Sequence, residues 1–312
     1  MSLHKYVSVP VVSQTSGKGA AKWAARQVQK KSGTQGAGTN RRPGWITYSI
    51  LSIVILVSAF PLYYVVLLAS SDQVTISQNV LPGLLPKEHF WDNVGQVFNG
   101  SIPVVRGFIN SLLIAVLQVI SVVTFSTLAG FSFAKLRFRG RGPLLVFVIA
   151  TMAVPTQLGV VPLFIVMSKL GLSNSIAAVI IPGLVTAFGV FWMTQYLENA
   201  LPYELIEAAR VDGASMIRTF WSIAMPAARP AAAMLALFTF IGSWVNYFWP
   251  SIILSPQNPT LPMVTKLLQS GYHTDYALIM AGVAISTAPL LVLFFVAGRQ
   301  LVAGIMQGAV KG

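Results

Sequence analysis

The chain has 312 residues, of which 55% are hydrophobic and only 9% are Asp, Glu, Lys or Arg. Soluble domains carry about 25% charged residues, so a chain this apolar could not cover its own surface in water, and a lipid bilayer is the expected solvent. The absence of cysteine excludes a disulfide framework and thiolate metal or redox chemistry. The net charge of +13 would suggest nucleic-acid binding in a soluble protein, but in a membrane protein it can report topology.

The first 44 residues contain no acid and are rich in Gly, Ser, Thr, Gln and Lys. This composition predicts a basic, disordered cytoplasmic tail held near anionic lipid headgroups. It does not predict a cleavable signal peptide, because no apolar core precedes residue 45 and the core that begins there has the length of a membrane span.

Six apolar stretches follow, each free of Asp, Glu, Lys, Arg and His and each reaching the ~20 residues that a spanning helix needs. They lie at about 45–70, 108–134, 143–168, 174–197, 230–254 and 276–298. All except the second contain proline. Proline kinks a membrane helix, which suits a structure that encloses a cavity but is also common in membrane proteins generally.

The loops between these stretches differ in basic charge. Of the 21 Lys and Arg residues, 17 lie in the N-terminal tail, in the loops after the second and fourth stretches, or at the C-terminal end. The alternate loops hold only Lys87, Arg106, Lys169 and Lys266. Because cytoplasmic loops are enriched in basic residues, this asymmetry places both termini in the cytoplasm and requires an even number of spans. The basic charge therefore indicates topology rather than nucleic-acid binding.

The chemistry that the chain lacks narrows its function. The apolar stretches contain no ionisable group from which a catalytic triad or a metal site could be built at membrane depth, which argues against an intramembrane enzyme. No phosphate-binding G-x-x-x-x-G-K-[ST] loop is present, so no P-loop ATP site is expected. Ion-coupled transporters usually carry charged residues at membrane depth, although carbonyls and hydroxyls alone can hold sodium. Energy for transport against a gradient is therefore expected to come from another subunit.

Two loops are distinctive. The long outer loop at 71–107 contains a short amphipathic piece near 90–98 and could either contact an external partner or simply cap the helix ends. The cytoplasmic loop at 198–229 contains four of the eight acids. Pro202 and the following acids predict a first helix, Asp212 and Gly213 predict its end, and a second helix is expected from about Ser215.

The second helix of this loop has an apolar repeat formed by Ile217, Phe220, Trp221 and Ala224, and Pro226 is expected to end it. An amphipathic hairpin on the membrane surface is one interpretation. Such helices usually have a basic polar face, whereas this loop is acidic toward its start. A helix pair docked in a cleft of another protein explains the acids, the alanines and the aromatic residues better.

The loop resembles the E-A-A, three residues, G, nine residues, I-x-L-P motif of permeases in binding-protein-dependent ABC importers. The matching positions are Glu207, Ala208, Ala209, Gly213, Ile223 and Pro226, with Met225 in place of leucine. Further segments are similar to the carbohydrate-uptake class, and to the second permease subunit of maltose-type importers. They read "YELIEAARVDGAS" in the loop, "NSLLIA" at 110–115, "FAKLRFRGRG" at 133–142 and "GAVKG" at 308–312.

The resemblance implies a type I ABC importer permease fold, all-α and integral to the bacterial cell membrane, over residues 45–312. It implies six transmembrane helices and a cytoplasmic helix–turn–helix coupling loop at about 198–229. The expected partners are a second permease subunit, two ATPase subunits that bind the ATP and Mg²⁺, and an extracellular or lipoprotein sugar-binding protein. No cofactor or enzymatic activity is expected in this chain. The residues expected to contact or support the ATPase are Glu207, Ala208, Ala209, Asp212, Gly213, Phe220 and Trp221.

The solute expected from the resemblance is a sugar, with an oligosaccharide favoured. Polar and aromatic residues within the spans could line its path, since aromatic rings stack on sugars and amides bond hydroxyls. The candidates are Gln157, Trp192, Trp244, Asn246 and Tyr247, together with Asn110 and Gln118. The family often has W-N-x-F at 244–247, and Val245 stands in the usual Asn position. Two alternatives remain: an ABC permease for another solute such as glycerol phosphate, and a self-contained secondary transporter.

Overall fold

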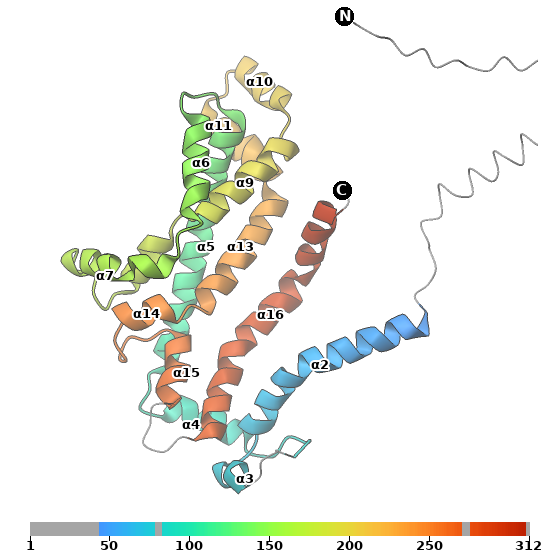
Figure 1. The fold of residues 1–312 in the computed structure, drawn as a ribbon, viewed down its shortest axis with the longest axis vertical. Coiled ribbons are helices and arrows are strands. Elements are labelled where there is room, and N and C mark those ends of the chain that lie inside the picture. Colours follow the sequence, from blue (N-terminus) through green and yellow to red (C-terminus); the bar gives the residue numbers. More distant parts are fainter. Residues whose placement is uncertain (1–43, 79–82, 270–274, 310–312) are drawn as a thin grey trace, which may run out of the picture. The chain divides into compact units, whose positions relative to one another are not determined.

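The computed structural model describes residues 44–78, 83–269 and 275–309, and within these ranges all regular secondary structure is helical (Figure 1). The tail predicted over the first 44 residues lies outside the described residues, apart from Gly44. The contacts divide the chain into two units, with the boundary between Phe60 and Pro61, inside the first described helix.

The helices follow one another in a nearly continuous series. In chain order they are α2 (Trp45–Ala69), α3 (Gln73–Gln78), α4 (Phe90–Asn99), α5 (Val104–Lys135), α6 (Arg141–Thr151), η1 (Thr156–Gly159), α7 (Val160–Lys169), α8 (Ile176–Ile180), η2 (Ile181–Gly183), α9 (Ala187–Ala200), α10 (Tyr203–Val211), α11 (Met216–Thr219), η3 (Phe220–Ala224), α12 (Met225–Ala227), α13 (Arg229–Trp244), α14 (Phe248–Ile253), α15 (Leu261–Gln269) and α16 (Tyr276–Ala309).

Among the described residues, four helical segments are long and apolar enough to cross a membrane: Trp45–Ala69, Val104–Lys135, Ile176–Ala200 and Tyr276–Gly298. Two further helix pairs pass the same test only as bent units, which brings the number to six if each pair is one span. The first pair bends by 88° and the second, Met216–Ala227 with Arg229–Trp244, by 78°. The six predicted apolar stretches thus correspond to helical regions, but those at 143–168, 174–197 and 230–254 are not single continuous helices.

The predicted stretch at 143–168 is broken in its middle. Helix α6 ends at Thr151, and the chain resumes as η1 and α7 after the 88° bend. Pro155 has an extended backbone, with φ −60° and ψ 125°, and proline also disfavours helical geometry in the residue before it. Proline does not always have this effect here, because Pro61 and Pro289 lie inside unbroken helices.

The predicted stretch at 230–254 is also broken. Helix α13 begins at Arg229, with Pro230 in its first turn, but ends at Trp244, and α14 starts at Phe248. A helix continuing through Pro250 would lose the bond to the carbonyl of Asn246 and would meet a steric clash there. The break places Pro250 in the first turn of α14, where proline is tolerated.

The main core lies where α5, α9 and α13 pack together. Its buried apolar residues include Phe131, Met193 and Leu235. At Gly130 the backbones of α5 and α9 approach so closely that an added Cβ would stand 2.7 Å from the Cβ of Met193 and 2.8 Å from its carbonyl carbon. Small residues permit such contacts between membrane helices, so Gly130 fixes the α5–α9 crossing.

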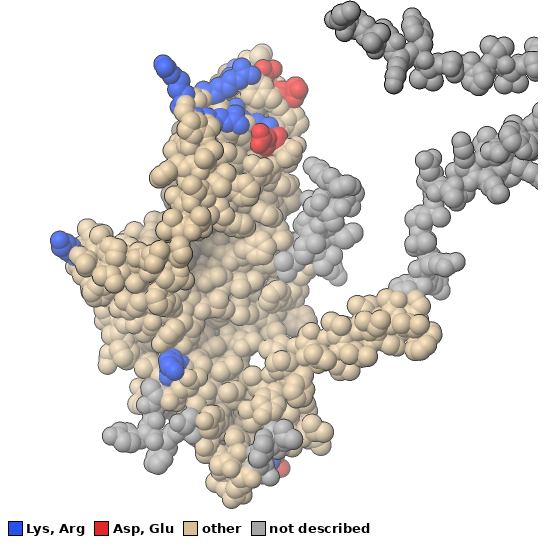
Figure 2. Space-filling model, in the orientation of Figure 1, with Lys and Arg blue, Asp and Glu red and all other residues tan. Residues whose placement is uncertain are grey.

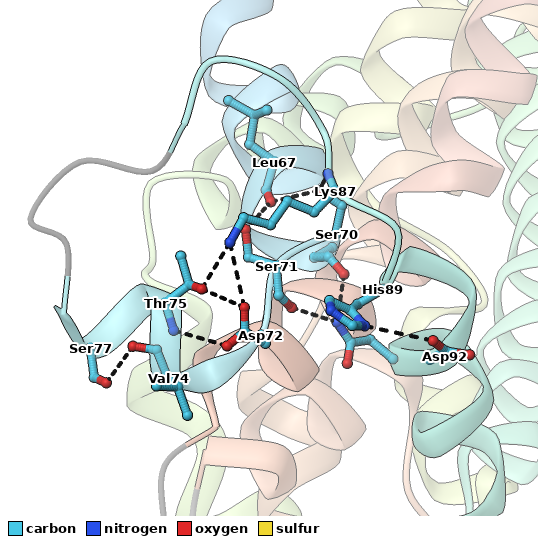
Figure 3. A network of polar contacts seen from close by, with 12 residues as sticks. Leu67, Ser70, Ser71, Asp72, Val74, Thr75, Ser77, Lys87, His89 and Asp92 are labelled. Carbon is cyan, nitrogen blue, oxygen red and sulfur yellow. Dashed lines mark hydrogen bonds and ion pairs between the residues drawn. The ribbon is translucent and has the colours of Figure 1, made fainter.

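At the other end of the unit, polar bonds organise the segment around α3 and α4 (Figure 3). Lys87 donates from its backbone N–H to Ser70 Oγ at 2.8 Å and from Nζ to Thr75 Oγ1 at 2.8 Å. Asp72 Oδ2 accepts from the Thr75 amide at 3.0 Å. The bonds from the Thr75 hydroxyl and amide, with the nearby Lys87 ammonium, hold the pKa of Asp72 well below its usual range. The amphipathic piece predicted near 90–98 is α4.

Candidate functional site

The loop at 198–229 forms the end of the unit that carries α10 and α11 (Figure 1). On the face shown in Figure 2, acidic and basic side chains gather at this end, and the surface directly below it is almost free of them. The loop comprises the last turn of α9, then α10, and then a second helical segment from α11 through η3 to α12. The structure therefore contains the predicted pair of helices joined by a tight turn.

The ends of α10 have recognisable capping geometry. Pro202 is extended and occupies the N-cap position, one residue before the predicted first turn. At the other end Gly213 has a φ of +73°. The Gly213 amide donates to the Arg210 carbonyl at 3.0 Å and the Ala214 amide to the Ala209 carbonyl at 2.9 Å, which is the Schellman pattern that ends a helix in a left-handed residue.

The second helical segment is less regular than predicted. Ser215 caps it, its Oγ accepting from the Arg218 amide at 3.3 Å. Residues Phe220–Ala224 then form a π-helical turn. The expectation that Pro226 ends this helix is wrong, because the chain stays helical to Ala227. Pro226 falls in the first turn after the π-helical turn, a position at which its missing N–H does little harm.

The inner face of the loop packs into the main core. Ile206 and Ala209 from α10 are buried, as are Phe220 and Ala224 from the second segment. The Phe220 ring lies 6.0 Å from the ring of Phe131 on α5, measured between centroids. Burial of these side chains against α5 and α9 attaches the loop to the membrane helices.

The outer face combines exposed apolar residues with acids. Val211 is 88% exposed, and Ala208 is exposed on the same helix. The predicted apolar repeat of the second helix is split, since Phe220 and Ala224 are buried while Ile217 is 74% and Trp221 55% exposed.

The acids of this face have no side-chain bond to the part of the chain that the structure describes. Within the described ranges, no side-chain hydrogen bond or ion pair involves Glu204, Glu207 or Asp212, and all three residues are exposed. Their carboxylates can therefore meet a partner without first breaking an internal contact. The outer face of the loop thus has exposed apolar residues next to acids, and its inner face is held by the core. Such a surface is suited to docking against a protein with apolar and basic groups.

Two basic residues, Lys135 and Arg137, support the loop, although the sequence had assigned them no contact with it. Lys135, the last residue of α5, donates from Nζ to the Glu198 carbonyl at 3.0 Å. The Arg137 guanidinium lies over the Tyr203 ring, 5.4 Å from its centroid. Their position directly after a long apolar stretch marked the end of a span, but nothing in the sequence indicated which backbone or ring they contact.

Most of the predicted path residues make internal contacts. The indole of Trp192 donates to the Ala231 carbonyl at 3.1 Å, and that of Trp244, which is 2% exposed, donates to the Ser286 carbonyl at 3.0 Å. Asn110 donates to the Pro259 carbonyl and Gln118 to the Val179 carbonyl. These bonds join helices to one another.

The other candidates lie at the two breaks in the predicted helices. Gln157 is exposed in η1, directly after the bend that follows α6. Asn246 and Tyr247 lie in the break between α13 and α14, where Tyr247 is 41% exposed. Within the described ranges no hydrogen bond joins Gln157 to Asn246 or Tyr247.

Comparison with known proteins supports one family. Residues 123–306, more than half of the chain, match the family described as binding-protein-dependent transport system inner membrane component. The lactose transport system permease protein LacG of Rhizobium radiobacter is 33% identical over 272 residues, which cover 87% of this chain and 97% of LacG. The arabinooligosaccharides transport system permease protein AraQ of Bacillus subtilis is 30% identical, with 85% of this chain and 94% of AraQ covered.

Two further similarities broaden the comparison. The sn-glycerol-3-phosphate transport system permease protein UgpE of Yersinia pestis is 29% identical, with 86% of this chain and 98% of UgpE covered. A chain from the crystal structure of a bacterial ABC transporter involved in alginate import has the same fold, with a TM-score of 0.71 and 23% identity over 81% of this chain and 94% of that chain. The chain therefore belongs to the family of binding-protein-dependent transport system inner membrane components and has the fold of an ABC importer permease.

Proposed function

We propose that this chain forms half of the translocation path of an ATP-driven importer for a sugar, with an oligosaccharide as the favoured solute. ABC importers work with a second permease, ATPase subunits and a substrate-binding protein. In this proposal the loop at 198–229 is cytoplasmic and docks in a cleft of one ATPase subunit. Both termini lie on the same side as that loop, in agreement with the distribution of basic residues.

The observation that carries the proposal is the two-sided construction of this loop. Its inner residues belong to the same buried cluster as residues of α5, α9 and α13. Its outer residues expose apolar groups and three acids without internal partners among the described residues. A segment built in this way can receive force from a soluble subunit on one side and pass it to the membrane helices on the other.

The proposed cycle follows from this construction. ATP and Mg²⁺ bind to the partner ATPases, and closure of the ATPase dimer displaces the docked loop. Because its inner face is buried against three membrane helices, the loop carries them with it and converts an inward-open permease to an outward-open one. Glu207 is the proposed charged contact. Ala208 permits close approach of the ATPase, and Trp221 contributes apolar contact area.

Two considerations favour a neutral sugar over glycerol phosphate. The relatives LacG and AraQ carry names of lactose and arabinooligosaccharide transport, and they match this chain at 33% and 30% identity. A phosphate ester would favour cationic groups along the path, and the six apolar stretches contain no Lys or Arg. The UgpE similarity keeps glycerol phosphate as the second candidate.

Docking can be tested by co-purifying the ATPase with the chain and the second permease. Glu207→Arg reverses the charge of the proposed contact, and Gly213→Val places a branched residue at a φ of +73°, which costs roughly 1–2 kcal/mol. Both changes should reduce ATPase association at least tenfold. Glu88→Arg is the matched control, since Glu88 is exposed on the segment before α4. The proposal fails if the Glu207 and Gly213 variants retain the ATPase as the control does.

The solute can be tested separately in proteoliposomes that contain the whole importer. Uptake of labelled lactose, an arabinooligosaccharide and sn-glycerol 3-phosphate is compared, each with its binding protein and ATP. Uptake of a sugar with no uptake of the phosphate ester is the expected result. The reverse pattern would establish the second candidate while leaving the docking proposal intact.

A further inference from the structure

The end of α5 holds a buried cation against the loop. Lys135 is only 9% exposed, and its Nζ donates to the Glu198 carbonyl at 3.0 Å. Glu198 lies in the last turn of α9, where carbonyls have no partner within the helix. A cation at this position also meets the negative end of the helix dipole. The contact thus gives a buried charge a partner and an unpaired carbonyl a donor.

A second basic residue holds the other side of the same joint. Helix α9 ends at Ala200, Leu201 and Pro202 are extended, and α10 begins at Tyr203. The Arg137 guanidinium lies 5.4 Å from the centroid of the Tyr203 ring, within the range of a cation–π contact. Lys135 therefore contacts the residues before the joint, and Arg137 contacts the residue after it.

Neighbouring residues of the same segment also pack against the loop. Leu136 packs against the buried cluster that contains Leu201 and Ile206. Phe131, one turn earlier on α5, lies beside Phe220 of the second helical segment. A single stretch of the chain, residues 131–137, thus touches α9, the joint, α10 and η3.

We propose that Lys135 and Arg137 are positioning residues that lock the α9–α10 joint, so that the docked loop and α5 move as one body. Without the lock, only apolar contacts such as those of Leu201 and Ile206 hold α10 at the two-residue connection of Leu201 and Pro202, so α10 can shift relative to α9 and α5. Movement of the ATPase would then turn α10 without reorienting the membrane helices. This proposal rests on the proposed docking function, and it assigns to Lys135 and Arg137 the transmission of the loop's movement to α5.

The reconstituted importer tests the lock by comparing ATP hydrolysis with and without solute-loaded binding protein. Lys135→Met keeps a long stem of similar volume and removes the donors, and Arg137→Ala removes the cation over Tyr203. Each variant should still bind the ATPase and hydrolyse ATP at the basal rate. Stimulation by the binding protein should fall about tenfold, within the usual range of coupling between sites. Lys135→Arg should restore part of it, and Arg139→Ala, an exposed residue of the same segment, should leave it unchanged.

A distance measurement separates positioning from a general loss of stability. The chain has no cysteine, so spin labels can be attached at Leu205 on α10, which lies outside the residues of the proposed contact, and at Leu128 on α5; they are 46% and 44% exposed. Without the lock, the distribution of distances between the labels should broaden while the complex remains assembled.

Unchanged stimulation and an unchanged distance distribution in both variants would overturn the lock. Should Lys135→Met fail to assemble, an unchanged result with Arg137→Ala alone would also overturn it. These outcomes are distinct from failure of the docking proposal, which is decided by ATPase association of the Glu207 variant.

Discussion

The two ends of the unit from Pro61 onward both carry acids, but they use them differently. Around α3 and α4, Asp72 binds Thr75 and Lys87, and Asp275 accepts from the Leu278 amide at the start of α16. At the loop of α10 and α11, Glu207 and its acidic neighbours bind no other described residue through their side chains. Acids of the first kind shape their own turns, whereas acids of the second kind remain available to a partner.

The means of attachment differ as well. The loop of α10 and α11 is fixed by apolar burial and by the close crossing of α5 and α9. The segment around α3 and α4 also buries Val97 in an apolar cluster, and hydrogen bonds to backbone and hydroxyl groups hold its turns in addition. Steric changes should therefore lower the stability of the first end most, whereas removal of donors should lower the stability of the second end most.

The largest effect is expected from Gly130→Ala. The added Cβ would lie within 3 Å of backbone atoms of Met193 and Thr194, so the two helices must separate. We expect a loss of about 3 kcal/mol in unfolding free energy together with reduced ATPase association, because the loop continues directly from α9. Thermal unfolding in detergent and co-purification provide the measurements.

Gly142→Ala is the matched control for this change. Gly142 lies in α6, and an added Cβ would meet nothing within 4 Å. Because alanine is the better helix former, this variant should be neutral or slightly more stable. Equal stability of the two alanine variants would show that the α5–α9 crossing does not hold the loop.

A smaller effect, confined to the other end, is expected from Asn93→Leu. Asn93 is 7% exposed, and its Nδ2 donates to the Ala69 carbonyl at 2.8 Å and to the Ser71 carbonyl at 2.9 Å. Leucine has a similar shape but leaves both carbonyls without this donor, at a cost of about 1–3 kcal/mol. Faster hydrogen exchange around α3 with normal ATPase association is the expected result. Asn99→Leu, on the exposed side of α4, should change neither quantity.

Features of the fold that depend on local sequence could be predicted, whereas features that depend on contacts between distant segments could not. The helix end at Gly213 depends on a local rule about glycine, and the structure confirms it. Local rules do not decide which prolines break a helix. Pro155 and Pro250 accompany breaks, whereas Pro289 lies inside a continuous helix, and this difference depends on neighbouring helices.

The site residues divide in the same way. The motif identified the loop, but it could not show that Ala209 is buried and Ala208 exposed, because that depends on where α5 and α9 lie beneath α10. Lys135 is the clearest omission, since the basic-residue count recorded its charge without revealing its contact with the Glu198 carbonyl. The burial and the contacts of a side chain that depend on distant segments cannot be predicted from the pattern of a single segment.

The smallest expected effect concerns pH and Asp72. Its pKa is lowered in the folded chain, above all by the bond from the Thr75 hydroxyl, so the carboxylate stabilises its turn at every pH above its ordinary pKa of about 3.9. That contribution should be lost only as the pH falls through the lowered folded value. Asp72→Asn should therefore accelerate hydrogen exchange around α3 by the same small factor from pH 8 to pH 5, and the two proteins should converge only in strong acid. A difference that disappears between pH 7 and pH 5 would contradict this assignment.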